Sequence, residues 1–576
     1  MIDADWFSNV TFLVYFTFVI LALTYLPWVA AVTGGGRWLK LPAERIVLGG
    51  VSYGVAGYVT FFAYFFSRAI GTTVTLIGAT GFVAAAVCAW RAGWLRRERL
   101  TNDPALTALV LVGLFTLALS AAGLIYGGMG DVLRTAAVRF SHHLPIDNAL
   151  PRLFEDGLYH NYIPRPLTGD WLTSDRPPLQ TGLALEVAPL AVQAGWRHDM
   201  AYELASIGAQ AFFLLGLAAY LAVWRLKDGA IAVGLVACAF SSVAIINGFF
   251  VWPKLIAAGF ILMTAALLLS PYYHEIRASW RHGALVGATA ALAMLSHGST
   301  AFILLAVVVL FLAMGRIPTW RFILAGGVCF IALMLPWSLY QALVDPPGNR
   351  LLKYHLADVT QVDPRSTWET LRDVYGPLSW QQILHTKWIN FQKIFDGMWD
   401  IPKWIGEAGG ALLAGDSARY HSLSGGLRGG QFFLVSSVVS VFYLGLPAVL
   451  LAVRHQKDAA RFVLVTGGVF LLTAVVWSLA MFKEGATIIH QGALAMPLMA
   501  IAAGAVGLYA LSPWLAIIVT GAEIMVSVAI FGIGVPDDFL KEYHEPLINP
   551  GMAVVAALGT IGFILACRRL GRQLGT

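Results

Sequence analysis

The sequence predicts an all-α polytopic membrane protein, and three observations support this fold class. The chain has 576 residues, of which 58% are hydrophobic and only 12% are charged, whereas an average soluble domain carries roughly 25% charged residues. The mean hydropathy is +0.72. Apolar runs of about 18 residues or more recur from end to end, and each is long enough as a helix to cross a hydrocarbon core of about 30 Å. A water-soluble fold is therefore excluded.

The apolar runs predict about fifteen transmembrane helices, each bounded by charged or turn-forming residues. In chain order they cover residues 9–33, 46–66, 72–90, 105–129, 203–224, 229–249, 254–270, 283–296, 299–315, 321–342, 431–453, 462–482, 492–511, 513–533 and 551–567. A further apolar run, 178–196, contains Glu186 and Pro189. Counting it as a crossing would move every later basic cluster to the opposite side of the membrane, so we expect an interfacial or re-entrant helix there.

The basic residues between these helices predict the orientation. Nineteen Lys and Arg residues flank the helices on one side, and only four lie in the short connections on the other. The positive-inside rule assigns the richer side to the cytoplasm. The N-terminus is then extracytoplasmic, the C-terminus cytoplasmic, and two long polar segments face outward. We call residues 130–202 the first polar segment and residues 343–430 the second polar segment.

The same pattern predicts four parts of the chain. Residues 1–104 add about three helices before a core at 105–342, which carries the first polar segment. The second polar segment follows, and residues 431–576 form the C-terminal transmembrane helices. The tryptophans of the second polar segment predict helices lying on the bilayer surface. Stacking on sugar rings is the alternative role for these residues, which are Trp368, Trp380, Trp388, Trp399 and Trp404.

Net charge and cysteine content exclude two other classes of interaction. The formal charge of +6 does not indicate nucleic-acid binding, because most Lys and Arg residues lie in short clusters between apolar runs. Membrane lipids are the expected surroundings instead. All four cysteines, Cys88, Cys238, Cys329 and Cys567, fall within apolar runs. We therefore expect small buried hydrophobic residues, with neither a disulfide framework nor a cysteine metal site.

The first polar segment holds an unusual density of charge between residues 142 and 185. Its acidic residues are Asp147, Glu155, Asp156, Asp170 and Asp175, and its basic residues are Arg152, Arg165 and Arg176. Asp147 lies between Pro145 and Asn148, a context typical of a turn or helix start. Its carboxylate is then expected at the membrane surface, where it serves either as a plain helix cap or as a reactive group.

The order of motifs here resembles the first periplasmic loop of integral-membrane glycosyltransferases of the GT-C fold. An acidic residue after a transmembrane helix is followed by Gly169-Asp170-Trp171 and then by Asp175-Arg176-Pro177-Pro178-Leu179. The branch with protein O-mannosyltransferases and lipid A aminoarabinose transferases is the most similar. The family often has Glu where Asn148 stands, and usually Lys at the position of Arg176. The resemblance covers residues 105 to about 345, including 245–255 and 295–301, and beyond them only the topology is similar.

This resemblance implies transfer of a sugar from a polyprenyl-phosphate donor to an acceptor hydroxyl, with inversion, on the periplasmic face of a bacterial inner membrane. The acceptor is a lipid, a glycan or a protein. Asp147 is the candidate general base, which must reach the acceptor oxygen. Arg176 is a candidate for bidentate binding of the donor phosphate. Asp175 either orients Arg176 or touches substrate.

Further charged residues on the outer side are candidates for binding the donor phosphate or the substrate. Lys254 follows Trp252-Pro253 at a helix end, where snorkelling to lipid headgroups is the alternative. The remaining candidates are His297, Lys483, His490, Glu155 and Asp156. The spacing of His and acidic residues predicts no metal ligands, and relatives differ in their use of a divalent ion. Metal dependence therefore stays open.

Two other classes compete with the transferase. A secondary transporter or lipid flippase fits the helix count, and Glu203 and Glu523 are the acidic residues within its helices; coupling to protons would make Glu523 essential. A glycan polymerase or ligase with a pyrophosphate-linked donor would share the membrane side and the cationic site. The order of motifs between residues 142 and 185 favours the transferase.

Overall fold

The structure is a computed structural model that describes residues 6–35, 39, 41–91, 102–141, 144–193, 195–273, 279–395, 400–420, 422–423, 456–483, 494–543 and 547–575. Helices dominate these residues, and an isolated bridge joins Thr168 to Trp171. Eight of the described helices are long and apolar enough to cross a membrane, or up to nine when a bent pair is counted as one span. The all-α polytopic class is confirmed, whereas fifteen crossings stay a prediction.

The predicted runs that fall on described residues are helical over most of their length, and the run 431–453 lies outside the described residues. The N-terminal helices are α1 (Trp6–Thr24), α2 (Leu26–Gly35), α3 (Pro42–Phe66), α4 (Arg68–Arg91) and α6 (Pro104–Gly123). The central helices are α11 (His198–Gln210), α12 (Phe213–Ala222), α13 (Asp228–Ala239), α14 (Ser242–Phe250), α15 (Lys254–Leu269), α17 (Trp280–Ser296), α18 (Thr300–Ala313), α19 (Trp320–Leu339) and η4 (Tyr340–Val344). The C-terminal helices are α26 (Lys457–Ala480), α27 (Ala495–Leu511), α28 (Pro513–Ser527), η6 (Val528–Ile533), α29 (Asp537–Glu542) and α30 (Pro550–Leu574).

One predicted helix, 229–249, is bent by 53° between α13 and α14. The cause is local, because the Ser241 side chain accepts a hydrogen bond from the Ala244 N–H and so caps a new helix in mid-run. Val251 ends α14 in the left-handed region at φ 52°, which is rare for a β-branched residue. The chain then turns through Trp252 and Pro253 into α15.

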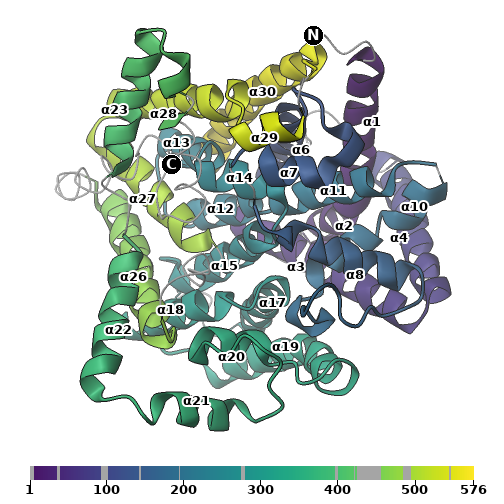
Figure 1. Ribbon diagram of the computed structural model, residues 1–576, viewed down its shortest axis with the longest axis vertical. Coiled ribbons are helices and arrows are strands. Elements are labelled where there is room, and N and C mark those ends of the chain that lie inside the picture. The colour runs from purple at the N-terminus through teal and green to yellow at the C-terminus, as the bar shows by residue number, and fades with distance from the viewer. Residues whose placement is uncertain are drawn as a thin grey trace.

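Helix α15 forms the centre of the molecule and is buried along its whole length. Figure 1 shows α12 and α15 in the middle, with the purple helices α1, α2 and α4 on one side and the green helices α22 and α26 on the other. A Cβ atom at Gly216 of α12 would lie 2.2 Å from the Gly259 carbonyl oxygen of α15. These two helices therefore approach so closely that only glycine fits between them.

The first polar segment folds into short elements packed on the central helices. They are η1 (Met129–Asp131), α7 (Val132–Val138), η2 (Ile146–Asn148), α8 (Leu150–Tyr159), η3 (Thr173–Asp175), α9 (Leu179–Leu185) and α10 (Ala188–Gln193). The run 178–196 is thus divided into α9 and α10, neither of which is long enough to cross a membrane. A Cβ atom at Gly182 of α9 would lie 2.0 Å from the Gly57 carbonyl oxygen, so α9 is pressed against α3.

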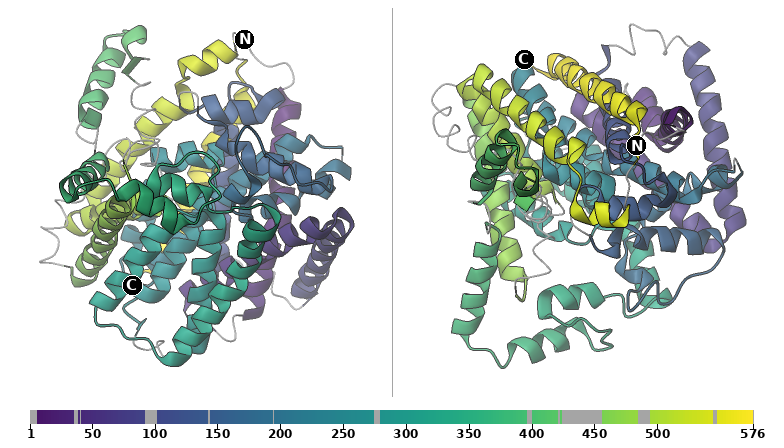
Figure 2. Two further views of the ribbon diagram at one scale, coloured as in Figure 1. Left: turned by 60° about the horizontal axis from the view of Figure 1, so that its bottom comes forward. Right: turned by 45° about the horizontal axis from the view of Figure 1, so that its top comes forward.

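The second polar segment forms α20 (Arg350–Ala357), α21 (Thr367–Tyr375), α22 (Trp380–Lys393) and α23 (Asp400–Leu413). Helices α20, α21 and α22 run along one edge of the molecule (Figures 1 and 2). Trp368, Trp380 and Trp388 are exposed, as both the bilayer and the sugar-stacking interpretations require. Trp399 and the side chain of Trp404 lie outside the described residues.

All four cysteines are free, as predicted. Cys238 and Cys567 are buried, but Cys88 is exposed and Cys329 is only partly buried. The expectation that all four are buried was therefore wrong for these two. Helix α4 packs mainly against α3 and α2, and among the described residues the face with Cys88 stays exposed.

Candidate functional site

Asp147 and Arg176 form a buried ion pair in the first polar segment. Asp147 lies in the short turn η2, directly before α8, as the flanking Pro145 and Asn148 predicted. The Arg176 Nη2 group donates a hydrogen bond of 2.8 Å to Asp147 Oδ1. Asp147 is 9% exposed and Arg176 7%, so water screens this pair much less than it would a surface salt bridge.

The guanidinium of Arg176 retains unused hydrogen-bonding capacity. Its Cζ atom lies 4.3 Å from the centre of the Trp171 ring, a cation–π contact. Its Nε atom is buried and has no hydrogen-bond partner among the described residues. A buried N–H without an acceptor is costly, so a ligand oxygen that reached this donor would relieve that cost.

Lys254, the first residue of α15, lies near this ion pair. The turn through Val251 sets its position, and the Val251 carbonyl is held by a 2.7 Å hydrogen bond from Gln180 Nε2. The Lys254 ammonium lies 3.6 Å from the centre of the Trp252 ring and is close enough to Asp147 and Arg176 for their charges to act on it. Lys254 is only 1% exposed, which argues against snorkelling.

Two histidines lie near Lys254. His297 follows α17, and its Nδ1 atom lies 2.8 Å from Ser299 Oγ. His355 lies on α20. Burial lowers the pKa of His297 well below its ordinary value, and the nearby charges of Lys254 and Arg176 lower it further. Burial and the Lys254 charge lower the pKa of His355 to about 4. Both imidazoles are therefore neutral at pH 7.

Asp175 connects the site to a residue that the sequence did not single out. Its carboxylate accepts a 2.9 Å hydrogen bond from Arg350 Nη1 and a 3.0 Å hydrogen bond from the Leu172 N–H. Burial raises the pKa of Asp175, and the Leu172 N–H and the charges of Arg350 and Arg176 offset this rise in part. Arg350 and His355 both come from α20, whose sequence carries no motif that would have revealed them.

Glu155 and Asp156 lie in a different cluster, formed by α8 and the start of α11. Arg152 Nη1 donates to Glu155 Oε2 over 3.0 Å, and His198 Nε2 lies 2.8 Å from Glu155 Oε1. Asp156 is 3.3 Å from the same Arg152. These contacts join α8 to α11, so both acids act in packing, and a role in substrate binding stays a prediction.

The remaining candidates, Lys483 and His490, follow α26 in the sequence. Lys483 forms an ion pair with Asp358, which directly follows α20. The Phe482 N–H donates a 3.0 Å hydrogen bond to the His355 carbonyl oxygen. Lys483 is thus held next to α20, while His490 lies outside the described residues. Among the described residues, no group of three His, Cys, Asp or Glu is placed to hold a metal ion.

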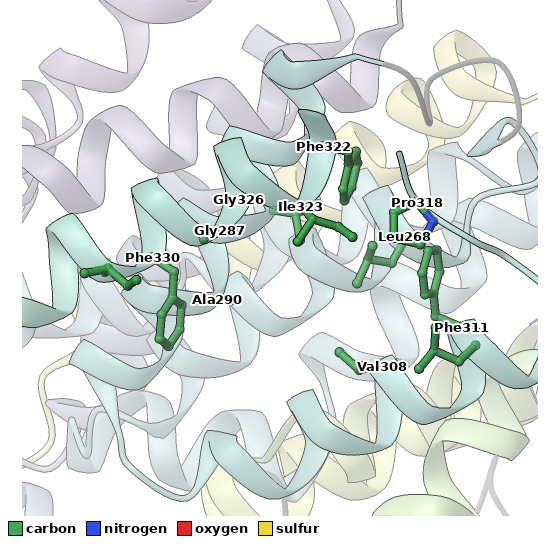
Figure 3. Close-up of a pocket in the computed structure, with 14 residues that line it drawn as sticks. Leu268, Gly287, Ala290, Val308, Phe311, Pro318, Phe322, Ile323, Gly326 and Phe330 are labelled. Atoms are coloured by element: carbon green, nitrogen blue, oxygen red, sulfur yellow. The ribbon is translucent and has the colours of Figure 1, made fainter. Parts of the chain in front are cut away.

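A groove of about 420 Å³ lies apart from these charges, between α17, α18 and α19. Figure 3 shows its lining side chains, among them Leu268, Phe311 and Phe330. Every lining residue is apolar or glycine. The groove therefore offers no group for acid–base chemistry, and the Asp147, Arg176 and Lys254 cluster is the candidate site.

No family model and no curated protein matches the chain. Among solved structures, the chain is similar to ArnT from Cupriavidus metallidurans bound to undecaprenyl phosphate, with 15% identity and a TM-score of 0.40 over 79% of this chain and 76% of that one. The apo state of the same protein gives 16% identity and a TM-score of 0.35 over 77% and 75%. ArnT is an aminoarabinose transferase of the GT-C fold, the branch that the loop motifs resemble.

Proposed function

We propose that this protein is a membrane glycosyltransferase that moves a sugar from a polyprenyl-phosphate donor to an acceptor hydroxyl. The observation that carries the proposal is the arrangement of Arg176, which is paired with Asp147 and still holds a buried Nε–H that has no acceptor within the part of the chain that the structure describes. A phosphate oxygen is the acceptor that best matches a guanidinium donor. Lys254 adds a second buried cation to the same cluster.

The charges of the cluster match those of the reaction. With Lys254 protonated, Arg176 and Lys254 carry two positive charges, and Asp147 with a sugar phosphodiester carries two negative charges. In the transfer, the acceptor oxygen forms a bond to the anomeric carbon while the bond from that carbon to the phosphate oxygen breaks. The acceptor proton passes to Asp147, and the electron pair stays on the departing phosphate, where the two cations stabilise the added charge.

Attack from the face opposite the leaving phosphate would invert the anomeric carbon. The predicted topology puts the cluster on the outer face of a bacterial inner membrane, where a lipid-linked donor is the available sugar source. The order of motifs from Asp147 to Leu179 supports the same class. The proposal includes no metal, and it leaves the acceptor as a lipid, a glycan or a protein.

The test is sugar transfer in reconstituted membranes from a panel of radiolabelled polyprenyl-phosphate sugars to extracted envelope material. We expect transfer by the wild type and its loss in Asp147→Asn, with donor binding largely retained. Asp373→Asn is the matched control, because this exposed carboxylate pairs with Arg365 on the surface of the second polar segment. Near-normal transfer by Asp147→Asn would remove Asp147 from the role of base.

One observation favours transport as a second candidate function. Glu203 of α11 is fully buried, and neither of its carboxylate oxygens has a hydrogen-bond partner among the described residues. Glu523 is likewise fully buried in α28. Acids of this kind mark proton pathways in transporters. No transfer from any donor by the wild type, together with substrate uptake that Glu203→Gln or Glu523→Gln abolishes, would establish this alternative.

A further inference from the structure

Trp171 lies between two guanidinium groups that come from different polar segments. Arg176, from the first polar segment, has its Cζ atom 4.3 Å from the ring centre, and Arg350, from the second polar segment, 4.9 Å. Each contact is a cation–π interaction, which strengthens where water is excluded. The Trp171 side chain, next to the proposed phosphate site, is therefore fixed in part by Arg350, which lies 179 positions further along the chain.

The two arginines differ in how fully their nitrogens are used. Arg350 donates from Nε to the Thr360 carbonyl over 3.1 Å, from Nη1 to Asp175 over 2.9 Å and from Nη2 to Asp170 over 2.8 Å. Arg176 uses Nη2 for Asp147, and its buried Nε has no partner in the described ranges of the chain. Each nitrogen of Arg350 thus donates to a protein oxygen, whereas Nε of Arg176 is left as a donor for a ligand.

We propose that Arg350 is a positioning residue that keeps Arg176 available for the donor phosphate, so that the anion site needs both polar segments. This inference rests on the proposed function. Arg350 acts by neutralising Asp175, the immediate chain neighbour of Arg176. The side chain of Asp175 is only 2% exposed, so a carboxylate deprived of Arg350 would seek another cation nearby. Arg176 is adjacent, and Asp175 would then compete with the phosphate for it.

The competition predicts a rescue that a simple loss of packing would not show. Arg350→Gln leaves Asp175 unpaired, so binding of phosphate to Arg176 becomes weaker. Asp175→Asn in the Arg350→Gln background removes the competing charge, and affinity should return. Residues that share one charge network typically show such non-additive effects.

The experiment measures binding of a long-chain polyprenyl phosphate to the full-length chain in nanodiscs, with thermal unfolding as the check on folding. We expect Arg350→Gln to weaken binding about tenfold and the double variant Arg350→Gln/Asp175→Asn to recover to within about threefold of the wild type. The matched control is Arg365→Gln, in the same polar segment, because Arg365 pairs with Asp363 and Asp373 instead. The affinity of the Arg365→Gln variant for polyprenyl phosphate should not change.

If Arg350→Gln does not fold, Arg350→Lys provides the test. Lysine keeps the charge beside Asp175 but loses the planar contact with Trp171 and the three-point bonding, so we expect an affinity about threefold below the wild type. Equal affinity of the Arg350 variants and the wild type, or no recovery in the double variant, overturns the positioning role. If the wild type does not bind polyprenyl phosphate, the proposed phosphate site is wrong. If it binds polyprenyl phosphate but transfers no sugar, only the proposed transferase function is wrong.

Discussion

Arg176 donates a 2.8 Å hydrogen bond to Asp147 inside the protein, with both side chains about nine-tenths buried. A buried pair of this kind is weak evidence for stability, because desolvation offsets much of its Coulomb energy. It does hold a carboxylate and a guanidinium in fixed positions next to Lys254. The pair therefore suits a reaction in which the carboxylate accepts a proton while the cations bind an anion.

Arg176→Lys tests the geometry of the phosphate contact. Lysine keeps the positive charge but offers a point donor in place of the planar fork, and it loses the stacking on Trp171. We expect polyprenyl-phosphate affinity to fall about tenfold in Arg176→Lys and about a hundredfold in Arg176→Gln. Arg165→Lys should bind normally, because Arg165 lies in the same polar segment as Arg176 but pairs with Asp345 of the second polar segment. Wild-type affinity in Arg176→Gln would rule out this contact.

Lys254→Gln tests the second cation. A hydrogen bond to a charged group contributes about 1.5–3 kcal/mol, so donor affinity should fall roughly ten- to hundredfold when the ammonium is removed. Lys387→Gln is the control, because Lys387 is also buried but donates to Tyr375 and to the Met481 carbonyl. That variant should lose thermal stability and keep donor affinity. Lost thermal stability with unchanged donor affinity in Lys254→Gln would instead make Lys254 a structural residue.

His355 should make the stability of the protein depend on pH. Its pKa is about 4 in the folded protein and about 6.5 in the unfolded chain, so the unfolded state binds the proton more tightly. Above pH 6.5 this group contributes nothing, and as pH falls from 6.5 towards 4 it costs up to about 3 kcal/mol, at about 1.4 kcal/mol per unit. Thermal unfolding between pH 4 and pH 7.5 should therefore show a shallower decline in His355→Gln than in the wild type. Parallel curves would contradict the lowered pKa.

Gly182→Ala tests whether packing beneath the site positions Arg176. The added methyl group would lie 2.0 Å from the Gly57 carbonyl oxygen, so α9 must move away from α3, at a cost of about 1–3 kcal/mol. Because Arg176 precedes α9 by three residues, donor affinity should fall together with the melting temperature. Gly409→Ala, at a helical position with open space around it, should leave affinity unchanged. An unaltered melting temperature in Gly182→Ala would contradict the close packing of α9 against α3.

The sequence alone predicted the class of fold and much of the site's composition. Hydropathy predicted the helices because each must bury its backbone polar groups within the bilayer. Local turn chemistry placed Asp147 in a short helical turn, and the resemblance to GT-C enzymes selected Asp147, Arg176 and Lys254 before their positions were known. These are properties of single segments, which a linear pattern can express.

Only the tertiary structure decided which of the candidate residues meet. Glu155 and Asp156 are as acidic as Asp147 and lie close to it in sequence, yet α8 directs them to Arg152 and His198. Arg350 and His355 belong to another polar segment and reach the site because α20 packs against it. Pairing of charges across 175 residues depends on packing and desolvation, which no local pattern encodes, and for this reason the sequence left these two residues unnoticed.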